Sequence, residues 1–188
     1  MNLKKRFLFG KTRGKNYIQG QVWVETVIYT LVAFALMGLV LAFVVPKVQE
    51  TQDKGIIQQS VGIMNNIDTT IRNLGSPGNQ RVIQLSIQKG SLTINATSDQ
   101  IIFNIESNYQ YSQPGENVTV GNLVVQDEKE NNIDVINMAL DYSGLYNLSY
   151  NGQEISKTLT SASTPYTVTI SDQGQDPSGN AIINFQVS

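Results

Sequence analysis

The side chains that most enzymes use for catalysis are missing from this 188-residue chain. It contains no histidine, which removes the commonest general base and the commonest metal ligand, and no cysteine, so no disulfide framework is possible. Serine and threonine are abundant, but the usual triad cannot be assembled without histidine, and no spacing supports a Ser-Lys pair. We therefore expect no catalytic residue, no cofactor and no enzyme activity.

Carboxylates are the remaining candidates for site chemistry, and their spacing argues against a metal site. From residue 78 onward the chain carries 11 carboxylates against four basic side chains, and they are scattered. The acidic cluster at residues 127–130 is expected to form a solvated turn between strands. Residues 172–176 resemble a calcium loop only loosely, because they lack the alternating ligands and terminal glutamate of the EF-hand pattern. An acidic turn fits them better, and no metal site is expected.

The most informative chemistry is a predicted peptide-bond cleavage near the N-terminus. Residues 1–20 hold six of the 13 basic residues and none of the 15 acidic ones, and residues 26–46 carry no formal charge. A secretory signal peptide places its apolar run before the cleavage site and loses it. Here the small residue Gly20 precedes the apolar run. Cleavage between Gly20 and Gln21 would therefore remove the basic leader and leave a mature chain that begins with a hydrophobic helix.

The ten residues GQVWVETVIY, residues 20–29, resemble the class III signal peptide of archaeal type IV pilins and archaellins. In that family a short basic leader ends in Gly or Ala, Gln opens the mature chain, Glu is its fifth residue, and an apolar helix follows. The resemblance covers residues 1–50. The family usually has Lys or Arg before the cleavage-site Gly, whereas this chain has Gln19. A competing cut after Gly14 would leave six extra residues ahead of Gln21.

The resemblance implies a structural subunit of an archaeal type IV pilus-like surface filament. The implied partners are identical or related pilin subunits, a prepilin peptidase, a pilus assembly ATPase and a membrane platform protein. The protein would cross the membrane once before assembly and then lie in an extracellular filament at the cell surface. An archaellin-type motility subunit shares the same motif. The alternative from another class is a membrane-anchored extracellular β-domain binding module.

Charge and length agree with an exported, membrane-associated chain. Without residues 1–20 the chain keeps seven basic and 15 acidic residues, a formal net charge of −8, which does not suit nucleic acid. A basic head on an apolar segment marks the cytoplasmic side of a membrane. As a helix, the 21 residues 26–46 would span about 30 Å, the thickness of a bilayer core.

Four residues are expected to take part in assembly: Trp23, Glu25, Gly38 and Pro46. In pilin-like proteins the residue matching Glu25 is thought to pair with the new α-amino group of a neighbouring subunit, which here belongs to Gln21. The other interpretation of Glu25 is an interfacial carboxylate that favours the helix N-terminus through the helix dipole. Gly38 lets a neighbouring backbone approach closely. Pro46 cannot donate to the preceding turn, so a kink or local opening is expected there.

The predicted fold class is α+β, with a long N-terminal helix followed by an antiparallel β-sandwich or β-barrel-like head. The helix covers residues 21–77, apolar all round over 21–46 and amphipathic over 47–77, and ends at the Gly-Ser-Pro-Gly run 75–78. The head covers residues 78–188, where apolar residues alternate with polar ones. A hairpin turning at Lys89-Gly90 joins residues 83–87 to 92–94. Further strands are expected at residues 100–106, 118–126, 145–150, 166–171 and 181–187, and residues 133–140 fit either a strand or a short helix.

Three N-glycosylation acceptors occur in the head, at Asn95, Asn117 and Asn147. Such triplets arise by chance in a chain rich in Asn, Ser and Thr. None occurs in the predicted helix, and this distribution favours a glycosylated filament surface.

Overall fold

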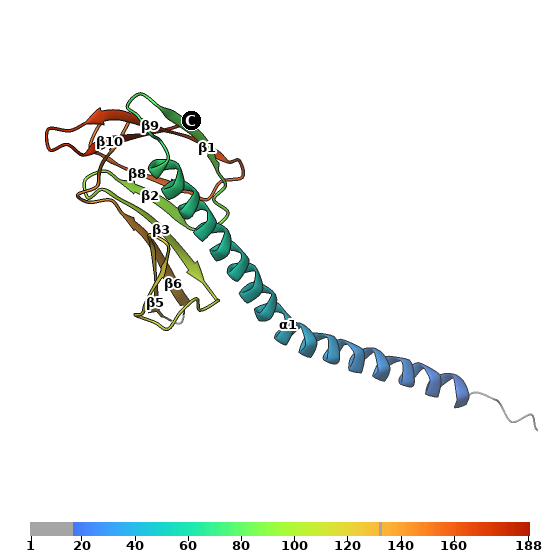
Figure 1. The fold of residues 1–188 in the computed structure, drawn as a ribbon. Helices are drawn as coiled ribbons and strands as arrows, with labels where there is room; N and C mark the ends of the chain where they lie inside the picture. The colour runs from blue at the N-terminus through green and yellow to red at the C-terminus, as the bar shows by residue number, and fades with distance from the viewer. Residues whose placement is uncertain (1–16, 132) are drawn as a thin grey trace, which may run out of the picture. The chain divides into compact units, whose positions relative to one another are not determined.

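The structure is a computed structural model that describes residues 17–131 and 133–188, with side chains described from residue 22 (Figure 1). Within these residues a single helix is followed by ten strands. The chain divides into two compact units, Met1–Pro46 and Lys47–Ser188. The first unit contains the apolar part of the helix, and the second contains the rest of the helix with every strand.

The helix α1 spans Tyr17–Arg72 and runs through Pro46 without ending there. It stops five residues before the predicted end at residue 77. The amide of Leu74 donates to the carbonyl of Ile71 (3.2 Å), which tightens the last turn, and Gly75 has a left-handed φ of 83°. The side chain of Asn79 then donates to the Leu74 carbonyl (2.9 Å). These bonds pair the carbonyls of Ile71 and Leu74 at the end of the helix, one from the last turn and one from beyond the Gly-Ser-Pro-Gly run.

The second half of α1 is amphipathic, as its periodicity predicts. Ile57, Met64, Ile67 and Ile71 are at most 2% exposed, at spacings of three, four and seven along one face. Two carboxylates, Asp53 and Asp68, are buried on the same side of the helix as this apolar stripe. Their partners in the head are described below.

The strands form two separate sheets, one with the order β1-β9-β10-β7 and one with the order β4-β5-β6-β3-β2-β8. Every pair is antiparallel except β7 with β10, which are parallel, so the head is mixed rather than purely antiparallel. The strands are β1 (Gln80–Leu85), β2 (Ser91–Asn95), β3 (Gln100–Ser107), β4 (Asn117–Val120), β5 (Leu123–Glu130), β6 (Ile133–Asp141), β7 (Tyr146–Tyr150), β8 (Ser156–Thr160), β9 (Tyr166–Gln175) and β10 (Ala181–Val187).

The predicted hairpin at Lys89-Gly90 is wrong. β1 pairs with β9, whereas β2 pairs with β3 and β8 in the other sheet, so the segment between β1 and β2 crosses from one sheet to the other. Gly90 is needed at this crossing, because its φ is 88° and an added Cβ would lie 2.3 Å from the Asn104 carbonyl oxygen. Alternation shows which face of a strand is buried, but it does not identify the partner strand.

The structure differs from the sequence prediction at two other strands and resolves one ambiguous segment. The single strand predicted at residues 118–126 is two, β4 and β5, joined at Gly121, whose φ is 66°. The ambiguous residues 133–140 form β6. β8 was not predicted, since Leu159 is its one fully buried side chain and gives almost no periodic signal.

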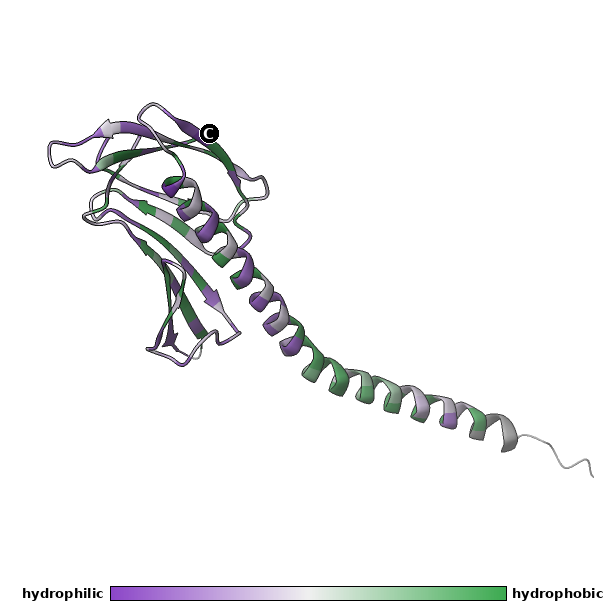
Figure 2. Cartoon of the chain, viewed as in Figure 1, coloured by the Kyte–Doolittle hydropathy of each residue, from purple (hydrophilic) through white to green (hydrophobic). Residues whose placement is uncertain are grey.

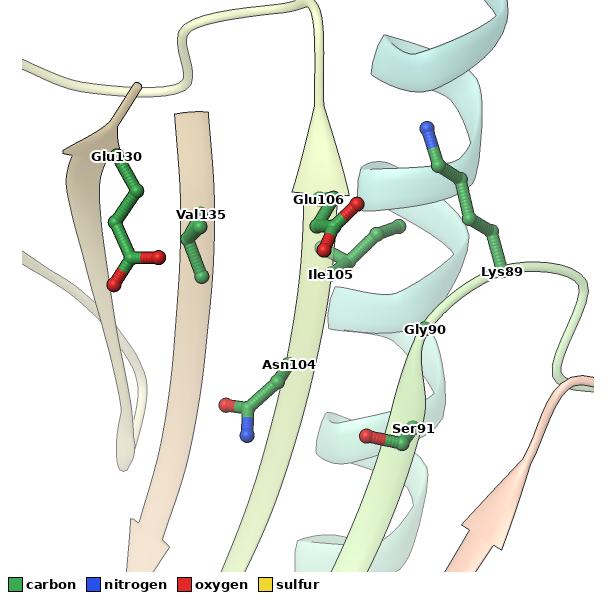
Figure 3. A pocket seen from close by; sticks show the side chains of 8 residues that line it. All are labelled: Lys89, Gly90, Ser91, Asn104, Ile105, Glu106, Glu130 and Val135. Atoms are coloured by element: carbon green, nitrogen blue, oxygen red, sulfur yellow. The ribbon is translucent and has the colours of Figure 1, made fainter. Parts of the chain in front are cut away.

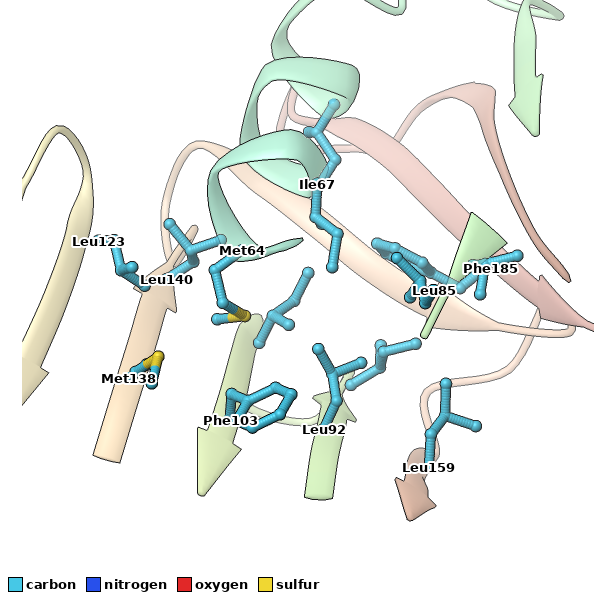
Figure 4. Packing of buried hydrophobic residues seen from close by; sticks show 14 of the residues in the cluster. Met64, Ile67, Leu85, Leu92, Phe103, Leu123, Met138, Leu140, Leu159 and Phe185 are labelled. Carbon is cyan, nitrogen blue, oxygen red and sulfur yellow. The ribbon is translucent and has the colours of Figure 1, made fainter. Parts of the chain in front are cut away.

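The core of the second unit lies between α1 and the inner faces of both sheets (Figure 4). Met64 and Ile67 come from the helix, Phe103 from the six-stranded sheet, and Leu85 and Phe185 from the four-stranded sheet. Each of these side chains is at most 2% exposed. Burial of this kind is what holds the second half of α1 to the head.

Candidate functional site

The candidate site in the first unit is the apolar helix segment, residues 22–46 of α1. All of its side chains are exposed, and Trp23 and Phe43 are 72% and 70% exposed. Figure 2 shows this part of α1 as mostly hydrophobic. Its length and composition would allow it to cross a membrane. A continuous apolar surface of this size marks a membrane or protein contact.

The two threonine hydroxyls within the apolar helix segment are satisfied by the helix itself. The hydroxyl of Thr26 donates to the Val22 carbonyl (2.9 Å), and that of Thr30 donates to the carbonyls of Thr26 and Val27. Glu25 is the one residue of the segment that carries a formal charge. Its carboxylate makes no hydrogen bond or ion pair with any of the side chains described from residue 22 onward.

Gly38 lies in open space, because an added Cβ would have no neighbour within 4 Å. Ala35, Gly38 and Ala42 recur at spacings of three and four, which places them along one strip of the helix. Nothing in the fold of the first unit requires a glycine at this position. Pro46 lies at the boundary between the two units.

The predicted scissile bond between Gly20 and Gln21 lies in the first turns of the described helix. The side chains of these two residues, and the whole of residues 1–16, lie outside what the structure describes. The first turn of a helix has unpaired amides and opens easily, so a helical start is compatible with proteolytic access.

The three acceptor asparagines lie on the head in different surroundings. Asn117 opens the edge strand β4 and is exposed. Asn95 is half-buried, and its side-chain oxygen accepts a hydrogen bond from the Ser156 hydroxyl (2.9 Å). Asn147 is half-buried in β7, and the hydroxyl of Ser149 in its triplet is buried and donates to Asn184 (3.2 Å). Asn117 is thus the most accessible acceptor.

Two buried aspartates of α1 fasten the helix to the head, and sequence reasoning did not identify either of them. The Asp68 carboxylate accepts hydrogen bonds from Asn122 (2.8 Å), the Tyr142 hydroxyl (3.0 Å) and Arg72 (3.0 Å). Burial, followed by the nearby Asp68 charge, raises the pKa of Tyr142 above its ordinary value. The only sequence signal was a charged residue within an apolar stripe.

The second of these carboxylates, Asp53, lies fifteen residues before Asp68 along α1. It accepts from the Lys89 ammonium (2.7 Å) and from both the backbone amide (2.8 Å) and side chain (3.0 Å) of Asn108. Asp53 therefore ties α1 to the β1–β2 crossing and to the loop after β3. These contacts position α1 and bring no catalytic group together.

The predicted turn at residues 127–130 is wrong, because these residues belong to β5 and Asp127 is fully buried. Residues 172–176 are partly strand, since β9 continues to Gln175. Asp176 accepts from the amides of Ser178 (2.8 Å) and Asn180 (2.9 Å), which is the bonding of an acidic turn. Among the described residues no three carboxylates, histidines or cysteines converge on a metal position.

A hollow of about 320 Å³ lies on the outer face of the six-stranded sheet (Figure 3). Ser91, Asn104, Glu106 and Glu130 line it from three strands, while Lys89 points toward the helix. The lining of the hollow therefore combines two glutamates with the neutral polar side chains Ser91 and Asn104.

Comparison with known proteins identifies no relative: no family model, no curated protein and no solved structure matches the chain.

Proposed function

We propose that the chain is a structural subunit of an archaeal type IV pilus-like surface filament, assembled through the apolar helix segment after removal of residues 1–20. One observation carries the proposal: residues 22–46 form a helix whose side chains are all exposed. The 17 large hydrophobic side chains exposed between residues 22 and 45 would gain on the order of 25–50 kcal/mol on leaving water, at about 1.5–3 kcal/mol each. This segment therefore requires lipid or other protein chains to shield it from water.

In the proposed function, two different surroundings shield the apolar helix segment from water, one before assembly and one in the filament. Lipid covers the segment first, which makes the chain a single-pass membrane protein. Helices of neighbouring subunits replace the lipid in the filament. Because lipid is as apolar as a leucine side chain, the exchange yields little hydrophobic gain, and close packing must supply the specificity. Gly38, with open space around it, and Glu25, the one formal charge of the segment, are the features suited to that contact.

The β-rich head would form the outer layer of the filament, as a sandwich-like body carrying the sugars. The peptidase, the assembly ATPase and the platform protein remain partners implied by the N-terminal resemblance. A membrane-anchored binding module would carry the same exposed helix. It would, however, need neither a free amino group at Gln21 nor a small residue at position 38.

Filaments sheared from the native cell provide the test. Electron microscopy should show filaments whose extracted subunit begins at Gln21 or its cyclised form by mass spectrometry. Gly20→Leu should abolish processing and filaments, and Gly14→Leu, the matched control at the competing site, should change neither. Two results would contradict this proposal: a surface protein that retains residues 1–20, or a chain that stays a detergent-requiring monomer while the pilus machinery is active. Either result would favour the membrane-anchored binding module.

A further inference from the structure

Two buried aspartates at one end of the six-stranded sheet have oxygen atoms without partners. Asp127 of β5 is fully buried, and Asp134 of β6 is 9% exposed. The Oδ1 atom of each is buried and accepts no hydrogen bond. A buried carboxylate oxygen without a partner is strongly unfavourable and is rare in folded proteins.

The strand register places these two carboxylates together. Asp127 lies opposite Ile136, and Asp134 precedes Ile136 by two residues on the same strand, so both aspartates face the inner side of the sheet as diagonal neighbours. Diagonal neighbours are about 7–8 Å apart between backbones, within reach of two side chains. Val135 and Glu130 alternate with them and line the hollow on the outer face (Figure 3).

The surrounding protein holds one of the two carboxylates rigidly. The Oδ2 atom of Asp127 accepts from the backbone amides of Tyr111 (2.8 Å) and Ser112 (3.3 Å), and its carbonyl accepts from the amide of Gly115 (2.8 Å). Asp127 thus anchors the loop between β3 and β4 at its middle and near its end. Its second oxygen, Oδ1, is buried and receives no hydrogen bond from these amides.

The basic residue opposite Asp134 in the strand register does not form an ion pair with it. Lys129 lies directly opposite Asp134 in the register, but it is exposed and forms no ion pair among the described residues. Ser107, also opposite Asp134, is buried and already exchanges hydrogen bonds with the backbone of Tyr109 (both 2.8 Å).

We propose that Asp127 and Asp134 bind a divalent cation that prefers oxygen ligands, with Ca²⁺ the best match. Carboxylates are hard ligands, and a chain without histidine or cysteine cannot form the usual zinc sites. Ca²⁺ accepts an irregular shell of carboxylate, peptide carbonyl and water oxygens, whereas Mg²⁺ requires near-octahedral geometry. Since no third carboxylate among the described residues converges here, peptide carbonyls and water would have to complete the shell. The cation would fasten the β3–β4 loop to the sheet, independently of filament assembly.

The test is a cation titration of the full-length chain in detergent after treatment with EGTA. CaCl₂ should raise the Tm of the head, followed by the circular dichroism of its tyrosines, by about 5–10 °C at a hundredfold excess over Kd. Terbium should bind at the same place and emit on excitation of Tyr109 and Tyr111. Asp127→Asn and Asp134→Asn should each abolish both responses. Asp176→Asn, in the acidic turn that resembles a calcium loop, is the matched control and should change neither.

The remaining outcomes overturn the proposal. A wild-type chain whose Tm and terbium emission do not respond has no cation site. If Asp127→Asn also raises the Tm in EGTA, the two carboxylates share a proton instead. Responses that persist in both variants place the cation elsewhere. Should Asp127→Asn fail to fold, Asp134→Asn with terbium at room temperature decides the question.

Discussion

Asp68→Ala should destabilise the head more than any substitution at an exposed charge of α1. The substitution leaves the buried Tyr142 hydroxyl and the Asn122 amide without an acceptor, because both donate to Asp68. Hydrogen bonds to a charged group contribute about 1.5–3 kcal/mol each, and the two together give roughly 3–5 kcal/mol after relaxation. The ion pair with Arg72 adds little, since the Arg72 side chain is 40% exposed.

Urea unfolding of the Lys47–Ser188 unit, followed by tyrosine fluorescence, measures this loss, which corresponds to a fall in Tm of roughly 10–15 °C. Glu50→Ala is the matched control on the same helix. Its pair with Lys47 is exposed, with 78% of the Lys47 side chain accessible, so a change within about 0.5 kcal/mol is expected. A double-mutant cycle with Tyr142→Phe should give a coupling energy of about 1 kcal/mol or more. A loss below about 1 kcal/mol for Asp68→Ala would refute the role assigned to this network.

Four further outcomes are expected. A fragment comprising Lys47–Ser188 should be soluble, β-rich and monomeric by sedimentation, since it keeps the buried stripe of α1 and loses the apolar helix segment; self-association would contradict this. Glu25→Ala should be processed and retained in the membrane but give sparse filaments by electron microscopy, whereas a normal filament yield would reduce Glu25 to an interfacial carboxylate. Sugar mass on native peptides should be highest at Asn117, because Asn95 and Asn147 are half-buried; preferential occupancy of Asn147 would contradict the accessibility argument. The pKa of Tyr142 is higher in the folded than in the unfolded chain, so the stability it contributes is present below about pH 10 and is lost as the pH rises further. Tyr142→Phe should remove that part of the slope of unfolding free energy against pH, and an unchanged slope would show that another group titrates.

The sequence pattern alone predicted an element and its buried face wherever all residues on one face of that element have the same surroundings, either the core or solvent. The uncharged run at residues 26–46 indicated a helix with apolar side chains all round, and the spacing of Ile57, Met64, Ile67 and Ile71 indicated which side of its second half is buried. The strands β3 and β10 were located to within one residue by alternation. These signals depend on neighbours a few residues apart, which the sequence lists directly.

Pairing between distant strands was decided only in three dimensions. β1 and β2 are adjacent in sequence yet belong to different sheets, and the parallel contact of β7 with β10 joins segments about 30 residues apart. Many partners satisfy the same alternation, because period two specifies a buried face and not a neighbour. Packing of both sheets into one core under α1 determines which of these strand pairings forms.

The buried carboxylates show most clearly which features need the tertiary structure and which do not. Sequence places Asp53 and Asp68 on a helix and Asp127 in an acidic run, where charged residues are ordinarily solvated. Only the folded chain supplies the donors from Asn108, Asn122 and Tyr142 that make the burial of Asp53 and Asp68 possible, and only the β5–β6 register sets Asp127 beside Asp134. The apolar character of residues 26–46 was readable from the sequence by itself, because it depends only on the residues of one continuous segment. The polar contacts of the head were not, since each requires a partner brought from far along the chain.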